Sequence, residues 1–203
     1  MSADPSSPEI RYSCIYFGYG SNLSSRSMKQ RCPDSLFVGL AVLPKWKWII
    51  NETGYANIIA GEETDVVYGS LCFLSQRDEK ALDESEGVPW LYEKLNLKVR
   101  RVLTPEELKG YGGQAPEVEA VCYVDTQRLV EGNIEKEYII WIAKAIEDAK
   151  KCGMPASYSD KYMSKHLPED FDANQEVQMV RTLRLDGKSA NLVPRGFAGW
   201  DRG

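Results

Sequence analysis

Short runs of β-branched and aromatic residues, separated by turn signals, constrain the fold of this chain most. The four clearest runs are "CIYFGYG", "VVYGSLCFL", "LNLKVRRVL" and "VEAVCYV". Val, Ile and Tyr favour extended backbone, so these runs predict strands of a mixed sheet. The strongest helical patterns come late in the chain, and strands followed by helices are typical of an α+β fold. The pattern leaves open whether the sheet curls into a barrel.

Four segments carry helical patterns. The strongest, residues 135–153, ends at Gly153 and places apolar side chains on one face at helical spacing. That face carries Tyr138, Ile142, Ala145, Ile146 and Ala149. Residues 24–31 and residues 157–167 are expected to form two short helices. Residues 105–117, with three glycines and two prolines, are expected to be a loop.

The fourth helical segment, "SQRDEKALDESE", begins with Ser75 as its N-cap, and Gly87 follows its end. Carboxylates crowd its last turn, although negative charge at the C-terminal end of a helix interacts unfavourably with the helix dipole. Departures from such local preferences are typical of functional sites. Repulsion and burial would raise the pKa of an inward-facing carboxyl toward the range of a general base. We expect Asp83 and Glu84 to form a solvated corner, and leave open whether Glu86 faces inward.

A glycine turn, "YFGYGSNLSS", ends the first predicted strand. Gly18 and Gly20 would allow positive φ and a close approach of the backbone to a ligand. Successive N–H groups in such a turn, followed by a helix start, form a concavity suited to a carboxylate. A dinucleotide-binding fingerprint would need a glycine at position 23, where the chain has Leu23, so a dinucleotide-binding protein is excluded. The alternative is an ordinary strand-to-helix turn in which Asn22 or Ser24 caps the helix.

Composition narrows the class of protein. With 203 residues, 43% of them hydrophobic, the chain can bury one core, and a net charge of −5 argues against a nucleic-acid partner. Five cysteines without a C-x-x-C pair suggest neither disulfides nor zinc, and are expected to be buried thiols in a reducing compartment. The sequence has no pattern of a signal peptide or membrane span, so we expect a cytoplasmic protein without a membrane partner.

We expect one folded domain over residues 14–168, after a flexible leader of residues 1–13. Residues 169–203 alternate like a hairpin around Asp186-Gly187, and are expected to form an edge hairpin or to cover a pocket. His166, the only histidine, is expected to lie at the surface, so no Ser-His-Asp or Cys-His site is expected. No fixed spacing of carboxylates indicates a metal site.

Four short motifs follow one another along the chain: "YGSNL" (19–23), "LDESEGV" (82–88), Tyr92 and "EYI" (137–139). In this order and spacing the chain resembles the γ-glutamyl cyclotransferase family, particularly fungal-type members, over about residues 16–167. The resemblance implies a small mixed β-barrel with flanking helices, and Glu86 as the acid–base residue. The substrate-binding residues that it implies are Tyr19, Gly20, Ser21, Asn22, Leu23, Tyr92 and Tyr138.

The resemblance implies an enzyme that uses no cofactor and no metal. The α-amine of a γ-glutamyl compound would attack its own γ-carbonyl and release 5-oxoproline with an amine or amino acid. Glu86 would carry a proton from the attacking to the departing nitrogen, and N–H groups of the glycine turn would bind the α-carboxylate or the oxyanion. The expected partner is a small γ-glutamyl molecule, as in glutathione metabolism, and a homodimer is left open.

Apolar residues near the motifs depart from the family pattern, namely Trp90, Leu91, Trp141 and Ala143. A bulky apolar lining would suit a hydrophobic leaving group, such as a glutathione-derived conjugate of secondary metabolism. One alternative is therefore a tailoring enzyme that removes a glutamyl group from a bulky secondary-metabolite intermediate, or performs another proton transfer on it. The other alternative is a non-catalytic binding module that keeps the pocket as a sensor.

Overall fold

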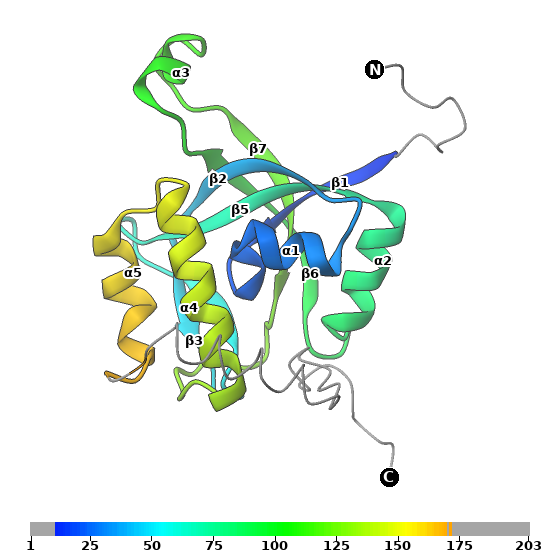
Figure 1. Ribbon diagram of the computed structural model, residues 1–203, viewed down its shortest axis with the longest axis vertical. Helices are drawn as coiled ribbons and strands as arrows, with labels where there is room; N and C mark the ends of the chain where they lie inside the picture. Colours follow the sequence, from blue (N-terminus) through cyan, green and yellow to red (C-terminus); the bar gives the residue numbers. More distant parts are fainter. Residues whose placement is uncertain (1–10, 170, 172–203) are drawn as a thin grey trace, which may run out of the picture.

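The computed structural model describes residues 11–169 and 171. Five strands close into a barrel in the order β1 (Tyr12–Gly18), β5 (Val66–Ser75), β2 (Leu36–Pro44), β6 (Glu93–Arg101) and β7 (Glu117–Val124). Neighbouring strands are antiparallel except at the closure, where β7 runs parallel to β1 and Val121 lies opposite Tyr16. The expected α+β fold is thus confirmed as a small mixed barrel with flanking helices (Figure 1).

The interior of the barrel is filled by apolar side chains from the inward face of each strand. Phe17, Leu71, Val99 and Cys122 are 0–1% exposed. The Phe17 ring lies so close to Gly69 that a Cβ there would approach it to 2.4 Å. Because burial of apolar surface is the main favourable term in folding, this packing holds β1 and its neighbours in place just before the turn at the end of β1.

A separate two-stranded hairpin, β3 (Trp46–Ile50) and β4 (Ala56–Ala60), packs beside the barrel. Trp48 pairs with Ile58 in its register, and both side chains are completely buried. The indole N–H of Trp48 donates a hydrogen bond to the carbonyl oxygen of Tyr19 at 3.0 Å. The hairpin therefore supports the turn that follows β1.

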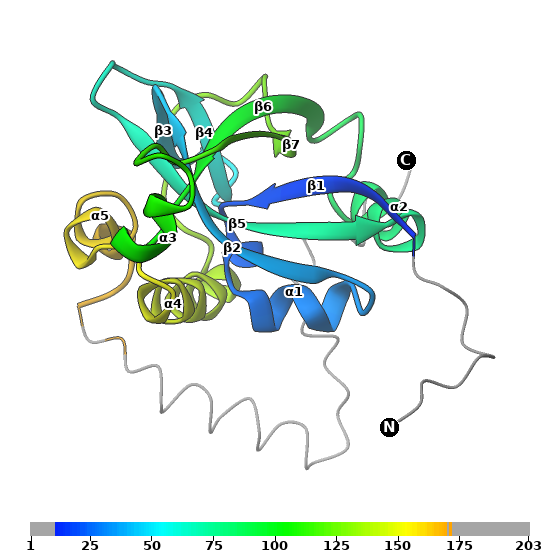
Figure 2. The same ribbon diagram turned by 90° about the horizontal axis from the view of Figure 1, so that it is seen from above.

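Helices flank the barrel as predicted: α1 (Ser25–Arg31), α2 (Gln76–Ser85), α4 (Lys136–Lys151) and α5 (Ala156–Tyr162), with short 3₁₀ turns η1 (Ser21–Leu23) and η2 (Ser164–His166). Ser24 and Ser75 cap α1 and α2 by accepting hydrogen bonds from backbone N–H groups. The five residues predicted for the apolar face of α4 are all buried. Figures 1 and 2 show α1 and α4 side by side, with α2 and α5 on opposite sides of the barrel.

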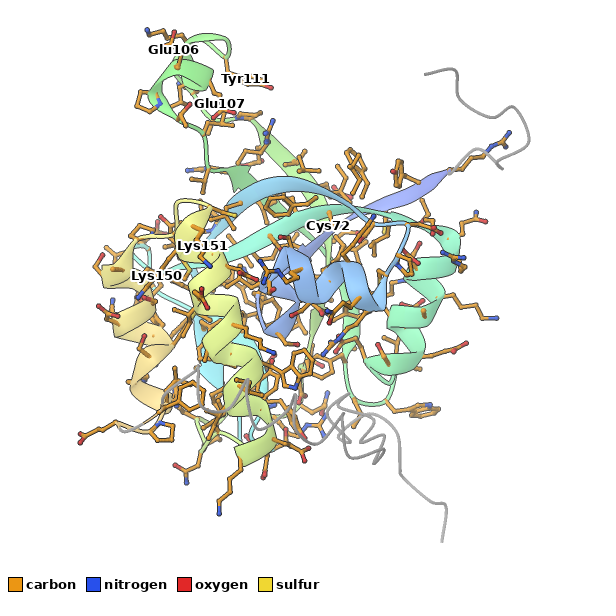
Figure 3. All side chains as sticks on the ribbon, viewed as in Figure 1. Cys72, Glu106, Glu107, Tyr111, Lys150 and Lys151 are labelled. Atoms are coloured by element: carbon orange, nitrogen blue, oxygen red, sulfur yellow. The ribbon has the colours of Figure 1, made fainter. Side chains whose placement is uncertain are left out.

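The prediction of a loop over residues 105–117 is wrong in part, because α3 (Pro105–Lys109) forms there. Thr104 caps this helix and Glu107 completes the capping box by accepting from the Thr104 N–H. The capping box forms this helix although three glycines follow within the same segment. Figure 3 shows Glu106, Glu107 and Tyr111 on this protruding segment, away from the rest of the barrel.

The start of the folded domain and the burial of the cysteines differ from the expectations. Strand β1 begins at Tyr12, so Tyr12 and Ser13 belong to the barrel and not to a leader. The remaining leader, residues 1–10, and the expected hairpin or pocket cover around residues 186–187 lie outside the described residues. The cysteines were expected to be buried thiols, which holds for Cys32, Cys72 and Cys122, but Cys14 is partly exposed and Cys152, at the end of α4, is exposed.

Candidate active site

Seven of the eight residues predicted for the site lie around one pocket. They are Tyr19, Gly20, Ser21, Asn22, Glu86, Tyr92 and Tyr138. The pocket has about 420 Å³ of space not filled by atoms, including its opening to solvent. Its residues come from β1 and the following η1 turn, the last residue of α1, the start of β4, the residues after α2, β7 and the start of α4.

Glycine is needed at these positions of the turn because there is no room for a Cβ atom, and not because the backbone φ angle is positive. Neither Gly18 nor Gly20 has positive φ, which corrects the expectation from the sequence. A Cβ on Gly20 would lie 2.8 Å from the Tyr138 hydroxyl oxygen, and one on Gly18 would lie 2.9 Å from the Asn22 carbonyl oxygen. Both contacts are closer than real Cβ atoms tolerate. Glycine therefore lets the turn pack against α4 and against itself.

Hydrogen bonds to buried groups fix the turn. The Ser21 N–H donates to the Tyr138 hydroxyl oxygen at 3.1 Å, and the Tyr19 hydroxyl donates to the carbonyl oxygen of Tyr123 at 2.6 Å. The Ser70 hydroxyl donates to the carbonyl oxygen of Asn22 at 2.9 Å. The Ser21 amide already has a partner, so it is not available to donate to a ligand. The turn therefore offers a ligand fewer backbone N–H groups than expected from the sequence.

The end of α2 sets the position of Glu86. The Val88 N–H bonds to the Asp83 carbonyl and the Gly87 N–H bonds to the Glu84 carbonyl, which is the Schellman pattern of helix termination. Gly87 adopts φ +66°, a conformation that favours glycine. Glu86 is the C-cap between the helix and this left-handed residue. The turn directs its side chain to the pocket, so the inward-facing alternative is the one found.

The Glu86 carboxyl is held in a poorly solvated environment. Burial raises its pKa to about 7, while the charge of Arg31 and a hydrogen bond from Asn22 act in the opposite direction. The Asn22 side-chain N–H donates to Glu86 Oε1 at 3.4 Å. A carboxyl with this pKa is present in both protonation states near neutral pH, which is the property that a proton shuttle needs.

Asn22 links charges of opposite sign. Its Nδ2 donates to Glu86 and, at 3.0 Å, to the Tyr16 hydroxyl oxygen, and its Oδ1 accepts from Arg31 Nη1 at 3.0 Å. The guanidinium carbon of Arg31 lies 5.5 Å from the centroid of the Trp141 ring, within range of a cation–π contact. Helix α4 therefore supports Arg31, and Arg31 in turn orients Asn22.

Tyrosine hydroxyls make up much of the polar wall. Burial raises the pKa of Tyr16 far above its ordinary value and that of Tyr138 to about 12, so both stay protonated near neutral pH. Each accepts a hydrogen bond from the turn, Tyr16 from the Asn22 side chain and Tyr138 from the Ser21 N–H. Each can then offer its own O–H to a ligand in the pocket.

Leu23 is the predicted site residue that does not line the pocket. It is 2% exposed and packs into the main core. The reason is the 3₁₀ turn of η1, which directs Leu23 inward while its neighbours Ser21 and Asn22 line the pocket. Leu23 anchors the turn in the core and does not line the pocket.

The expectation that Asp83 belongs to a solvated corner is wrong. Its carboxylate accepts from the Tyr123 hydroxyl at 2.7 Å and lies 2.9 Å from Lys94 Nζ. Lys94 and Tyr123 are paired in the register of β6 and β7, so the barrel presents both groups to the end of α2. This cation offsets the unfavourable helix dipole. Glu84 is exposed, as expected.

The apolar residues that suggested a bulky substrate lie outside the pocket wall. Trp90 is 87% exposed, and neither it nor Leu91, Trp141 or Ala143 lines the pocket. The Leu91 side chain packs over Gly87, where an added Cβ would approach it to 2.8 Å. The walls are formed mainly by tyrosines with their hydroxyls engaged, so the pocket is more polar than these four residues suggested.

His166 is not a surface residue, contrary to the prediction. Its side chain is only 10% exposed and its ring packs against Trp48 with centroids 5.8 Å apart. Its Nε2 lies 3.5 Å from Glu131 Oε1. The η2 turn after α5 returns the chain to the β3–β4 hairpin, a contact that local polarity did not reveal. His166 does not line the pocket.

Among residues 11–169 and 171, no three His, Cys, Asp or Glu side chains are grouped so as to hold a metal ion. Within the same residues, none of the helices combines the length and the apolar character needed to cross a bilayer.

Five residues of the pocket wall were not predicted from the sequence, namely Tyr16, Arg31, Tyr55, Ala56 and Tyr123. Tyr16 stands two residues before Gly18 at the end of the same strand, so its place near the turn was readable from the sequence. Arg31 and Ala56 had no such signal. Arg31 reaches the pocket because α1 packs against η1, and Ala56 reaches it because its Cβ lies beside Gly20.

Comparisons with known proteins agree with this fold. The family model described as "Gamma-glutamyl cyclotransferase, AIG2-like" matches residues 16–141, which include both the glycine turn and Glu86. No curated protein sequence matches the chain.

Solved structures share the fold. A protein described as "Gamma-glutamyl cyclotransferase" superposes with a TM-score of 0.62 at 23% identity, covering 83% of this chain and 98% of that one. An uncharacterized protein from Homo sapiens, loc79017, gives a TM-score of 0.62 at 25% identity, covering 85% and 99%. YkqA from Bacillus subtilis gives 0.50 at 19% identity, covering 82% of this chain and 54% of that one.

Proposed function

The chain belongs to the gamma-glutamyl cyclotransferase, AIG2-like family, and from that premise we propose that it cyclises γ-glutamyl compounds to 5-oxoproline, with Glu86 as the proton shuttle. The observation that carries the proposal is the meeting of Glu86 with the glycine turn in one pocket, where Asn22 donates a hydrogen bond to the carboxylate. The substrate proposed is a small molecule with a γ-glutamyl amide, whose leaving group is an amine or an amino acid.

The reaction places simple demands on the pocket. The α-nitrogen forms a bond to the γ-carbonyl carbon, the amide C–N bond breaks, and the leaving nitrogen departs. Over the whole reaction the α-ammonium loses two protons and the departing amine gains two. A carboxylate that accepts a proton from one nitrogen and returns it to the other leaves the balance unchanged. The pKa of about 7 of Glu86 suits both steps.

The oxyanion that develops on the γ-carbonyl needs donors that are already in place. In this proposal the hydroxyls of Tyr16 and Tyr138 serve, because both line the pocket and both are held by the turn. Preorganised donors of this kind contribute a few kcal/mol in known enzymes. The pocket also has to hold the glutamyl chain folded back on itself, so that its own amine reaches the carbonyl.

The test is product formation. The purified protein is incubated with γ-glutamyl dipeptides, glutathione or γ-glutamyl-lysine, and 5-oxoproline is measured by mass spectrometry. We expect turnover of at least one compound, lost in Glu86→Gln and retained in Glu84→Gln, which removes an exposed carboxylate from the same helix end. Absence of 5-oxoproline from all of them, or equal activity of Glu86→Gln, would refute the proposed function.

A further inference from the structure

Arg31 is the only cation among the described residues that line the pocket. It is the last residue of α1 and is half-buried. One guanidinium nitrogen, Nη1, donates to Asn22 Oδ1 at 3.0 Å, and its carbon lies 5.5 Å from the centroid of the Trp141 ring. A guanidinium carries five N–H donors, so this bond leaves others for a ligand. The cation is therefore fixed and has donors to offer.

The charge of Arg31 is not consumed by Glu86. No ion pair within 4.0 Å joins these two residues in the described part of the chain, although the charge of Arg31 acts on the Glu86 carboxyl. The Asn22 amide lies between them, with its nitrogen toward Glu86 and its oxygen toward Arg31. The pocket thus holds a fixed cation and a proton-accepting carboxyl on either side of one small polar side chain.

This arrangement is complementary to the head group of an α-amino acid, in which an ammonium and a carboxylate are attached to the same carbon. We propose that Arg31 binds the α-carboxylate of the γ-glutamyl group while the α-amine faces Glu86, an inference that rests on the proposed function. The glycine turn alone is a weaker candidate for that carboxylate, because the Ser21 N–H is bonded to Tyr138. Arg31 is then a substrate-binding residue that sets the orientation of the attacking amine.

Recognition of the substrate by Arg31 then requires a free α-carboxylate. Trp141 also gains a role as a positioning residue, because its ring supports the guanidinium from α4. Lysine cannot replace arginine fully here, since an ammonium lacks the planar fork that both stacks on the ring and bonds to Asn22 and a carboxylate together.

Binding of the ring product tests the inference without turnover. Titration calorimetry with 5-oxoproline and with 2-pyrrolidinone, which lacks only the carboxylate, gives a ratio of dissociation constants. We expect wild type to bind 5-oxoproline about 10- to 100-fold more tightly, as for a charge-assisted hydrogen bond, and Arg31→Met to lower that ratio toward one. An unchanged ratio in Arg31→Met, or no preference for 5-oxoproline in wild type, would overturn the assignment.

Matched variants separate this inference from loss of folding and from the proposed function. Arg26→Met removes an exposed arginine of the same helix outside the pocket, and should keep the wild-type ratio. Arg31→Gln and Arg31→Lys provide further variants if Arg31→Met unfolds, and both should lower the ratio, lysine less. If the ratio behaves as expected but no γ-glutamyl compound yields 5-oxoproline, the carboxylate site stands and the proposed reaction fails. If turnover occurs and the ratio is insensitive to Arg31, only the inference fails.

Discussion

The side-chain nitrogen of Asn22 lies 3.4 Å from the carboxylate oxygen Oε1 of Glu86, and this contact joins the turn after β1 to the end of α2. The two residues are 64 positions apart in the sequence. The amide donates to the ionised form of the carboxyl, whereas burial favours the protonated form. The balance of these effects gives the carboxyl its pKa near neutrality and leads to the first two predictions.

Replacing Glu86 by Gln should stabilise the protein at high pH. The folded-state pKa of Glu86 is raised from 4.5 to about 7, so between these values the folded protein binds more protons than the unfolded chain. Stability therefore falls as pH rises through this window and stays lower above it. We expect Glu86→Gln to raise the free energy of unfolding by about 3 kcal/mol at pH 8 and much less at pH 5. Urea unfolding at both pH values, with Glu84→Gln as control, measures the difference; equal effects at both would contradict the prediction.

The rate should depend on ionised Glu86. If the carboxylate takes a proton from the α-ammonium, kcat/KM for a γ-glutamyl substrate rises with pH through an apparent pKa of about 7. The hydrogen bond from Asn22 lowers the pKa of Glu86, so Asn22→Ala should move this acid limb to higher pH. Initial rates measured from about pH 5 to about pH 9 test both effects. A limb that stays in place in Asn22→Ala would show that Asn22 does not act on Glu86.

Removal of the Tyr138 hydroxyl should weaken the glycine turn. In Tyr138→Phe the Ser21 N–H loses its partner inside a buried region, at a cost of about 1–3 kcal/mol in stability. The proposed reaction would also lose an oxyanion donor, so kcat should fall with a smaller effect on KM. Urea unfolding and steady-state kinetics give the two readings, and Tyr111→Phe on the exposed α3 segment is the control. Unchanged stability and rate would mean that the hydroxyl supports neither.

Gly20 should not tolerate a side chain. In Gly20→Ala the new Cβ would lie 2.8 Å from the Tyr138 hydroxyl oxygen and 3.2 Å from the Cβ of Ala56. The turn or α4 has to move, so we expect a loss of about 1–3 kcal/mol in stability together with loss of activity. Gly110→Ala is a suitable control because Gly110 is exposed and its φ of −64° suits alanine. Thermal unfolding of both variants would reveal a tolerant turn if their midpoints matched.

The two tryptophans near the motifs should behave differently. Trp90→Leu changes a residue that is 87% exposed and outside the pocket, so kcat/KM for small γ-glutamyl substrates should stay within about twofold. Trp141→Leu removes the ring beneath Arg31, and a cation–π contact of about 1 kcal/mol predicts a loss of about fivefold. Parallel kinetics on the two variants test this. A larger effect from Trp90→Leu would return the bulky-substrate alternative to consideration.

Much of the fold was predictable because its signals are local. The Ser24 and Ser75 caps and the glycine after Glu86 are short-range features, and four of the five barrel strands follow from the predicted runs of β-branched and aromatic residues, whereas β2 was not predicted. The family resemblance added the barrel and the place of Glu86 in the site. Local composition failed at residues 105–109, where a capping box competed with nearby glycines and won.

The sequence by itself determined where α2 ends, because the glycine that terminates the helix is the next residue along the chain. The order of the motifs predicted, through the family resemblance, that the glycine turn and Glu86 share a site. Only the tertiary structure decided how the site is completed. Arg31 enters the pocket, Leu23 packs into the core, His166 packs against Trp48, and Asp83 pairs with Lys94, all through contacts between separate elements of the fold. Such contacts depend on strand register and helix packing, and no local pattern of charge or polarity encodes them.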